Sequence, residues 1–367
     1  MATIFDAHHH ILPPMVGSSS FDEECLKENL YHMRFGGPGG IRRVRDNVLL
    51  DVPVLEGSGD GISYLPDVNY RVGEAGRMIF TYQGEDYYTL FLQPGATDMS
   101  STVETVISHM DYAGVDRAII QHDRVYGRLD DYVGEAISNY PDRVVGLAQV
   151  DEWKGGDPGQ LERLHRQVND LGFSGLYFAT GGFMHNDFAF GINEPILEPL
   201  WETVADLGVP IHWYATKNRR PRFENYIEEL RDLNRLANAH PYIPSVLTHG
   251  LENLRIDWTD PRRFDLLPEL VELIGREHWH LELMIHKMLH DHEFSPYHPE
   301  GPKLVSRLMD TFGVEKLLWG SDMPSCEMMT TYRHSRLLFE SQCEFLTQDE
   351  RSAILGGNLE RLYPPST

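Results

Sequence analysis

A run of three histidines near the start of the chain has residue types and a spacing suited to metal binding. His8, His9 and His10 are flanked by Ile4-Phe5 and Ile11-Leu12, a pattern typical of a buried strand. Side chains alternate along a strand, so the imidazoles of His8 and His10 point to one side about 7 Å apart and can converge on one ion where the strand ends. A histidine cluster without function, or a tag fragment, is the alternative, but a tag would not lie inside a strand pattern. The spacing therefore predicts a metal site.

Three further donors stand at or just after apolar runs later in the chain. His212 ends the run 210–212, His249 ends the run 244–249, and Asp322 follows the run 316–319. Each of them alone is more often a structural histidine or a helix N-cap. Together with the first histidines they place a nitrogen or carboxylate donor at four of the eight strand ends predicted below. We therefore expect them to meet around one site.

Two segments carry further candidates for substrate contact. Arg219 and Arg220 lie in a basic segment that follows His212 and also contains Lys217 and Arg222. Guanidinium groups hold carboxylates with paired hydrogen bonds, so these arginines are candidates to bind a substrate carboxylate. A solvated basic loop explains them equally well.

Histidines also follow the seventh apolar run, and they are His286, His290, His292 and His298. We expect His286 to line the pocket and weigh a second metal site as the alternative. Glu282, inside that run, is a candidate partner for a metal-bound histidine. Aromatic residues near other strand ends either pack the mouth of the fold or contact a planar substrate; they are Tyr177, Phe178, Trp213 and Tyr214.

Short apolar runs alternate with helical patterns from about residue 100 onward. The runs are 117–121, 144–148, 175–178, 210–212, 244–249, 280–284 and 316–319, and an eighth run, 3–8, opens the chain. Between them, residues 197–207 place apolar side chains at a period near 3.6, which predicts a helix. Eight strands separated by helices predict a distorted (β/α)₈ TIM barrel, formed by a single domain over residues 1–367. A doubly wound open sheet is the competitor, but it usually has fewer strands and a glycine-rich first turn.

One stretch interrupts the repeat of strand and helix. Residues 11–99 are too long for a plain loop and too aromatic for a disordered segment. We interpret them as a long insertion after the first strand, on the face where barrel active sites lie, either as a cap over the pocket or as a surface insertion. Near the other end, Thr347–Glu350 has capping-box spacing and predicts a last helix.

The amino-acid composition argues against several kinds of binding partner and cofactor site. The 367 residues carry 32 Lys+Arg against 56 Asp+Glu, a net charge of −24, so nucleic acid and anionic membrane surfaces are poor partners. Three cysteines are too few and too scattered for a disulfide framework or a cysteine-type zinc site. No apolar run has membrane-spanning length and no secretory leader pattern opens the chain, so we expect a cytoplasmic protein.

The motifs together resemble the amidohydrolase superfamily, in the amidohydrolase-related branch that includes aminocarboxymuconate semialdehyde decarboxylase. Besides the opening His-x-His, the resemblance rests on YAGVDRAIIQ (112–121), YPDRVVGLAQVD (140–151), LGFSGLYF (171–178), LGVPIHW (207–213), LTHG (247–250), LLWGSDMP (317–324) and ILGGNLERLY (354–363). Only the insertion falls outside it.

The resemblance implies roles for individual residues. The implied metal ligands are His8, His10, His212 and Asp322, and the implied acid/base residue is His249, with Asp322 sharing that work. Dinuclear members commonly carry a lysine or glutamate at the end of the fourth strand, where this chain has Leu-Tyr-Phe-Ala at 176–179, so one divalent ion is expected. Zn²⁺ and Mn²⁺ both suit these ligands.

We therefore expect a metal-dependent, non-oxidative decarboxylase of a small aromatic or conjugated carboxylic acid. The alternative is a hydrolase that cleaves a lactone, an amide or a similar bond with metal-activated water. A third hypothesis is that the protein is a barrel that binds a ligand without turnover. The branch often dimerises, so a homodimer is expected by resemblance.

Overall fold

The computed structural model describes residues 2–37, 39–215, 223–251, 266–285 and 300–364. Arg219, Arg220 and His286 lie outside the described residues, as do the other basic residues of 217–222 and the histidines of 290–298.

Eight parallel strands form the central barrel. In their order around it they are β1 (Phe5–His9), β6 (Arg117–Ile120), β7 (Val144–Ala148), β8 (Gly175–Ala179), β9 (Ile211–Tyr214), β10 (Ser245–Thr248), β11 (Trp279–Leu283) and β12 (Leu317–Trp319). The end of β12 returns to β1, where His10 N–H donates to Met323 O at 2.8 Å and Asp322 N–H donates to His8 O at 2.9 Å. The (β/α)₈ barrel predicted from the strand-helix repeat is confirmed.

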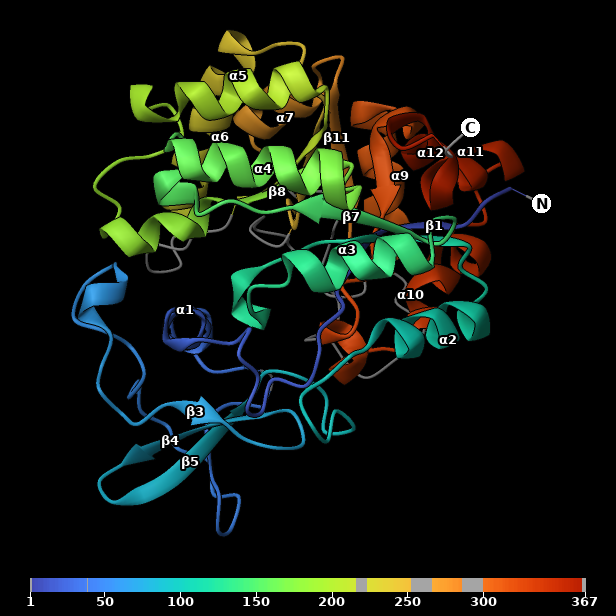
Figure 1. Cartoon of the computed structure of the whole chain (residues 1–367). Coiled ribbons are helices and arrows are strands. Elements are labelled where there is room, and N and C mark those ends of the chain that lie inside the picture. Colours follow the sequence, from blue (N-terminus) through green and yellow to red (C-terminus); the bar gives the residue numbers. More distant parts are fainter. Residues whose placement is uncertain (1, 38, 216–222, 252–265, 286–299, 365–367) are drawn as a thin grey trace.

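Helices pack around the outside of the barrel (Figure 1). They are α2 (Val103–Ala113), α3 (Asp130–Asn139), α4 (Pro158–Leu171), α5 (Glu198–Leu207), α6 (Phe223–Ala239), α7 (Pro268–Ile274) and α9 (Glu300–Phe312), followed by α10 (Tyr332–Leu337), α11 (Gln348–Ser352) and α12 (Asn358–Leu362). The helix predicted at 197–207 is α5, whose buried Leu200, Trp201 and Val204 face the sheet. The predicted capping box at Thr347 and Glu350 begins α11.

The core has an inner and an outer layer, as in other barrels of this type. Inward-facing side chains such as Phe5, Ile119, Tyr177 and Leu318 form one cluster inside the barrel. A larger cluster fills the space between strands and helices. The face of a strand on which a residue lies therefore decides whether it can reach the site.

The insertion after β1 has a small sheet of its own. It contains α1 (Glu23–Met33) and the strands β2 (Arg42–Arg43), β3 (Arg71–Val72), β4 (Arg77–Tyr82) and β5 (Glu85–Leu90), paired antiparallel in the order β2-β5-β4-β3. Figure 1 shows this sheet beside the barrel, with α1 between them. Leu12 and Ser101 exchange two backbone hydrogen bonds of 2.9 and 3.0 Å, so the insertion leaves and rejoins the barrel at one point.

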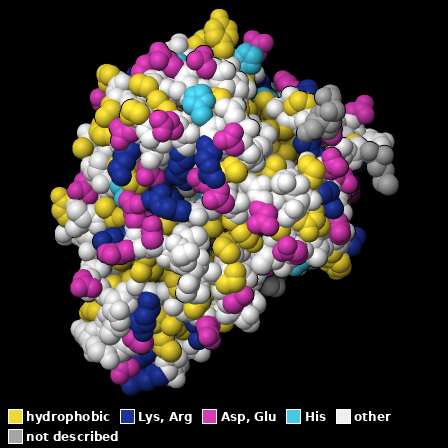
Figure 2. Space-filling model, viewed as in Figure 1, with side chains coloured by type: hydrophobic (Ala, Val, Ile, Leu, Met, Phe, Trp, Pro, Cys, Tyr) yellow, Lys and Arg dark blue, Asp and Glu magenta, His cyan; other side chains and the backbone are white. Residues whose placement is uncertain are grey.

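The helices and the surface charges bear on the kinds of partner that the protein could bind. None of the helices in the described part of the chain is long and apolar enough to cross a membrane. On the face shown in Figure 2, Lys and Arg side chains are intermixed with Asp and Glu.

Candidate metal centre and active site

A bulge in β1 positions the histidine motif. The register with β6 runs from Asp6 opposite Ala118 to His9 opposite Ile120, so β1 carries one extra residue there. Bulges turn side chains to a new direction and are frequent next to active sites. Here Ala7 belongs to the inner core, whereas His8 and His10 beyond it bring their Nε2 atoms within 3.1 Å of each other.

Asp322 joins the two histidines from the far end of the chain. Its Oδ1 lies 3.3 Å from His10 Nε2 and 3.6 Å from His8 Nε2, and all three side chains are buried. Metal–ligand bonds of about 2.0–2.2 Å place neighbouring donor atoms roughly 3.0–3.5 Å apart. These three donors therefore fit the first shell of one divalent ion.

Hydrogen bonds set the tautomer of both imidazoles. His8 Nδ1–H donates to the Glu282 carboxylate, with distances of 3.1 and 3.2 Å to its two oxygens, and His10 Nδ1–H donates to Gln121 O at 2.8 Å. Each proton is then held at Nδ1 and each Nε2 lone pair points toward Asp322. Partners of this kind orient metal-binding histidines in proteins.

The loop after β12 is held in place by a buried carboxyl group that the sequence did not mark as functional. Asp6 accepts hydrogen bonds from Ser321 Oγ at 2.6 Å, Ser321 N at 2.9 Å and Tyr332 OH at 2.8 Å. Burial raises the pKa of Asp6 to about 7, although these hydrogen bonds oppose the rise. Asp6 thereby ties β1 to the loop that presents Asp322.

His249 lies beside the metal centre. Its ring centroid is 4.8 Å from that of His8 and 4.4 Å from that of Tyr214. His249 and Asp322 both have left-handed backbone conformations, with φ of 52° and 53°. Such conformations cost about 1–3 kcal/mol and cluster at functional sites, where they aim side chains.

In the structure, both ring nitrogens of His212 face residues other than the three clustered donors. Its Nε2 pairs with the Tyr363 hydroxyl at 2.9 Å, and its Nδ1 is 3.5 Å from the Gln121 amide nitrogen. Burial lowers the pKa of His212 to about 3, so the ring is neutral. Tyr363 from the C-terminal segment enters the inner core and pairs with this ring, so the ligand role expected for His212 stays a prediction.

The aromatic candidates divide between the two faces of the sheet. Tyr177 lies inside the barrel, where its hydroxyl donates to Asp123 Oδ2 at 3.4 Å. Phe178 and Trp213 lie in the outer layer, where their rings pack on each other at 5.3 Å and on Trp201. Side-chain alternation explains the difference, and it disfavours substrate contact by Phe178 and Trp213.

The segment that follows β6 forms another wall of the site. The Tyr126 ring lies 4.6 Å from the His10 ring, and its hydroxyl is 2.8 Å from Ser325 Oγ. Phe91 of the insertion packs on Tyr126 at 5.2 Å, so the insertion reaches the residue that contacts a candidate ligand. Nothing in the sequence marked Tyr126 or its neighbours as part of the site except their place after a predicted strand.

A parallel barrel whose strand ends bring histidine and carboxylate side chains together has the layout of a TIM-barrel enzyme, in which the active site lies at the C-terminal ends of the strands. The family model for Amidohydrolase matches residues 5–364, so the chain belongs to the amidohydrolase family. Members of the amidohydrolase superfamily are enzymes that use a divalent metal. A search of curated proteins finds no match.

Several solved structures share the fold. A protein described as a probable 2-pyrone-4,6-dicarboxylic acid hydrolase from Acinetobacter baumannii has a TM-score of 0.54 and 19% identity, over 73% of this chain and 91% of its own. A manganese-bound dihydroxybenzoic acid decarboxylase from Polaromonas sp. JS666 has a TM-score of 0.50 and 17% identity, over 72% and 86%. A TIM-barrel protein from Bordetella bronchiseptica has a TM-score of 0.56 and 14% identity, over 98% of both chains.

Proposed function

We propose that the protein is a non-oxidative decarboxylase of a small aromatic or conjugated carboxylic acid and that it uses one divalent ion. The observation that carries this proposal is the convergence of His8, His10 and Asp322 on one point, with both histidine tautomers set for ligation. The end of β8 offers Ala179 and Thr180, and neither is a bridging ligand for a second ion. Decarboxylases occur among the structural neighbours, which supports the choice of reaction.

The residues of the site suit this chemistry. A bound ion would hold the substrate carboxylate and a neighbouring oxygen and would polarise them. His249, next to His8, would donate an imidazole proton to the carbon that bears the carboxylate, and Asp322 would share the acid/base work. That proton bonds to the carbon through a π electron pair of the aromatic or conjugated system. The carbon–carbon bond then breaks, its electron pair restores the π system, and the carboxylate leaves as CO₂.

Hydrolysis is the second candidate, favoured by the pyrone-dicarboxylic acid hydrolase among the neighbours. The same donors suit activation of a water molecule, with Asp322 or His249 accepting its proton. The substrate would then be a lactone, an amide or a similar bond.

The experiment that separates the two is a turnover screen of the metal-loaded protein. Aromatic and unsaturated carboxylic acids are tested for CO₂ release, and lactones and amides for ring opening or cleavage. We expect CO₂ release that His249→Asn reduces by about 100-fold or more, the scale of general acid catalysis. Lactone or amide cleavage without CO₂ release would replace the proposal with the hydrolase, and full activity of His249→Asn would overturn the role of His249.

We also propose which ion the site binds, which residues contact the substrate, and where and in what assembly the enzyme acts. The ion is Zn²⁺ or Mn²⁺, held by His8, His10 and Asp322; His212 remains a fourth candidate whose ring would first have to leave Tyr363. Substrate contacts are proposed for Tyr177 and, from the sequence alone, for Arg219, Arg220 and His286. We also propose that the enzyme acts in the cytoplasm as a homodimer, without a nucleic-acid or membrane partner.

A further inference from the structure

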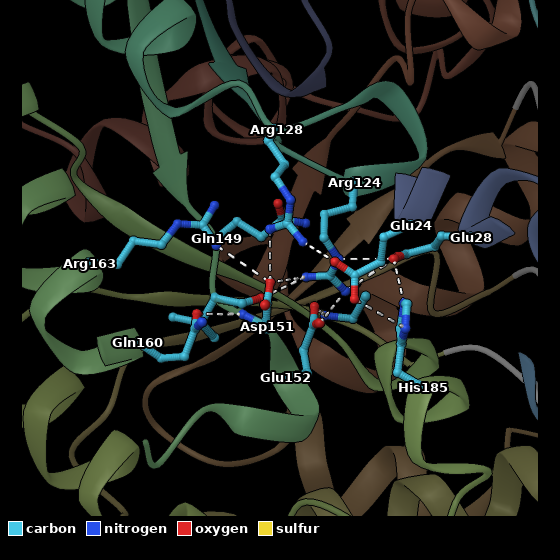
Figure 3. A network of polar contacts seen from close by, with 12 residues as sticks. Glu24, Glu28, Arg124, Arg128, Gln149, Asp151, Glu152, Gln160, Arg163 and His185 are labelled. Carbon is cyan, nitrogen blue, oxygen red and sulfur yellow. Dashed lines mark hydrogen bonds and ion pairs between the residues drawn. The ribbon is translucent and has the colours of Figure 1, made fainter. Parts of the chain in front are cut away.

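A fully buried arginine stands at the centre of the polar network in Figure 3. Arg124 begins the 3₁₀ helix η2 (Arg124–Tyr126), directly after the segment that follows β6. Its Nε donates to Glu28 Oε2 at 2.9 Å, its Nη2 donates to Glu152 Oε2 at 2.6 Å, and its Nη1 donates to Val150 O at 2.8 Å. All three nitrogens of the guanidinium group are therefore used.

The partners of Arg124 come from separate parts of the molecule. Glu28 belongs to α1 of the insertion, whereas Glu152 belongs to the 3₁₀ helix η3 (Glu152–Lys154) after β7. His185, after β8, places its Nε2 2.9 Å from Glu28 and stacks on Trp153 with ring centroids 3.8 Å apart. The arginine thus links the insertion to the loops that follow three adjacent strands.

The charges in this network compensate one another. Burial opposes ionisation of Glu28, but Arg124 and His185 bring the pKa of that carboxyl down to about 2. Burial raises the pKa of Glu152 to about 7 against the opposing effect of Arg124. A planar guanidinium donates in fixed directions, so it can satisfy both carboxylates and a carbonyl at once, which a lysine ammonium cannot do with the same geometry.

The segment that Arg124 anchors also holds the candidate ligand His10. Gln121 O, three residues before Arg124, accepts the His10 Nδ1–H, and the Tyr126 ring, two residues after it, packs on the His10 ring. Asn29 of α1 adds a second link, because its Nδ2 donates to Val125 O at 3.1 Å. Residues 121–126 therefore contact His10 on one side and the insertion on the other.

We propose that Arg124 is a positioning residue for the metal ligand His10 and that Glu28 couples the placement of the insertion to this ligand. The inference rests on the proposed metal centre and not on the type of reaction. It gives the insertion a role beyond covering the pocket, because displacement of α1 would move the segment that orients His10.

The test measures metal affinity in two variants and a matched control. Arg124→Lys keeps the positive charge but loses the planar guanidinium and its fixed N–H directions. Glu28→Gln keeps nearly the same shape and removes the negative charge that pairs with Arg124. Arg128→Gln is the control, because Arg128 also joins the insertion to the loop after β7, through Asp22 and Asp151, but lies outside residues 121–126. Dissociation constants for Zn²⁺ and Mn²⁺ come from competition with a chelating dye, and hydrogen exchange reports on residues 121–127.

Both variants are expected to bind metal about 10- to 100-fold more weakly, the usual effect of losing a residue that orients a ligand, and to exchange faster in 121–127. Arg128→Gln should match the parent in both measurements. Parent-like metal affinity in Arg124→Lys and Glu28→Gln, even with a lowered melting temperature, would overturn the proposal. If Arg124→Lys does not fold, Glu28→Gln decides alone. Neither measurement needs a substrate, so a parent that binds metal without releasing CO₂ would refute the decarboxylase and leave this test intact.

Discussion

At the scale of single residues, the proposed centre depends on where two imidazole protons lie. The Nδ1 protons of His8 and His10 have buried acceptors, one a carboxylate and the other a backbone carbonyl. This leaves both Nε2 atoms as ligands facing Asp322. The two acceptors differ in kind, so only the carboxylate of Glu282 can be removed by substitution.

Replacement of Glu282 should weaken metal binding. Glu282→Gln keeps an acceptor for His8 Nδ1–H but removes the negative charge that makes the imidazole a stronger ligand, so we expect a loss of about 10-fold or more in metal affinity. Competition with a chelator measures it. Glu327→Gln is the control, because Glu327 pairs with His109 and touches none of the three candidate ligands. Equal metal affinities in the two variants would show that Glu282 does not support the metal ligand His8.

Acid should destabilise the protein through His122. Burial lowers the pKa of His122 to about 4, although nearby Asp130 opposes this, and its Nε2 accepts the Leu129 N–H at 2.9 Å. Between about pH 6.5 and pH 4 the unfolded chain binds a proton that the folded chain does not, so stability falls as the pH is lowered through this window, by up to roughly 3 kcal/mol.

The measurement for His122 is the free energy of unfolding against pH. His122→Gln should make the slope between pH 4 and 6.5 less steep, and the remainder comes from groups such as His212, whose pKa burial also lowers. Replacement of the exposed His334 by Gln should leave the slope unchanged. An unchanged slope in His122→Gln would show that other groups cause the acid sensitivity.

At the scale of elements, the ends of three strands build the centre. The bulged end of β1 supplies His8 and His10, β11 supplies Glu282, and the loop after β12 supplies Asp322. Close packing between neighbouring strand ends leaves little room. A Cβ on Gly320, which follows β12, would lie 2.1 Å from Glu282 Oε1.

A methyl group at Gly320 should therefore disturb metal binding. Gly320→Ala must displace the Glu282 carboxylate from His8, and we expect a loss in metal affinity at least as large as that of Glu282→Gln. Gly159→Ala is the control, since Gly159 lies in α4 with nothing near its Cβ position, and alanine there should be neutral or stabilising by about 0.5–1 kcal/mol. Parent-like affinity in Gly320→Ala would contradict the tight fit described for this strand end.

Strand positions and the convergence of His8, His10 and Asp322 could be predicted from the sequence, because apolar runs and donors at their ends are local patterns. The position of His212 could not, because it depends on Tyr363, which is 151 residues away and fills the inner core. The role of Gln121 also left no signal, since its contact with His10 is made by a backbone carbonyl that any residue would offer. Phe178 and Trp213 show a third limit, because a run of aromatic residues does not reveal which face of the strand each one takes.

At the scale of the whole molecule, the insertion and the barrel share their packing. One continuous apolar cluster includes Met78 and Phe80 of the insertion together with Val106 of α2 and Leu200 of α5. A buried ion pair joins Glu28 of α1 to Arg124 after β6, and Arg124 also pairs with Asp151 and Glu152 after β7. We propose on this basis that the chain is a single domain.

A single domain should unfold in one transition. None of the six tryptophans lies in residues 11–99, and the five that the structure describes lie on the strands, helices and loops of the barrel. Their fluorescence therefore reports on the barrel, whereas far-ultraviolet circular dichroism reports on the whole chain. We expect the two thermal transitions to coincide and both to move upward when metal is added, because a ligand of the folded state stabilises it. An earlier transition seen only by circular dichroism would show that the insertion unfolds independently.

We propose that His8, His10 and Asp322 hold one catalytic ion. The most direct measurement is the number of divalent ions per chain, obtained by native mass spectrometry of the Zn²⁺- or Mn²⁺-loaded protein and of its His10→Asn variant. We expect one tightly held ion per chain in the parent and none in the variant at the same metal concentration. No ion in the parent, two ions in the parent, or one ion retained in His10→Asn would contradict it.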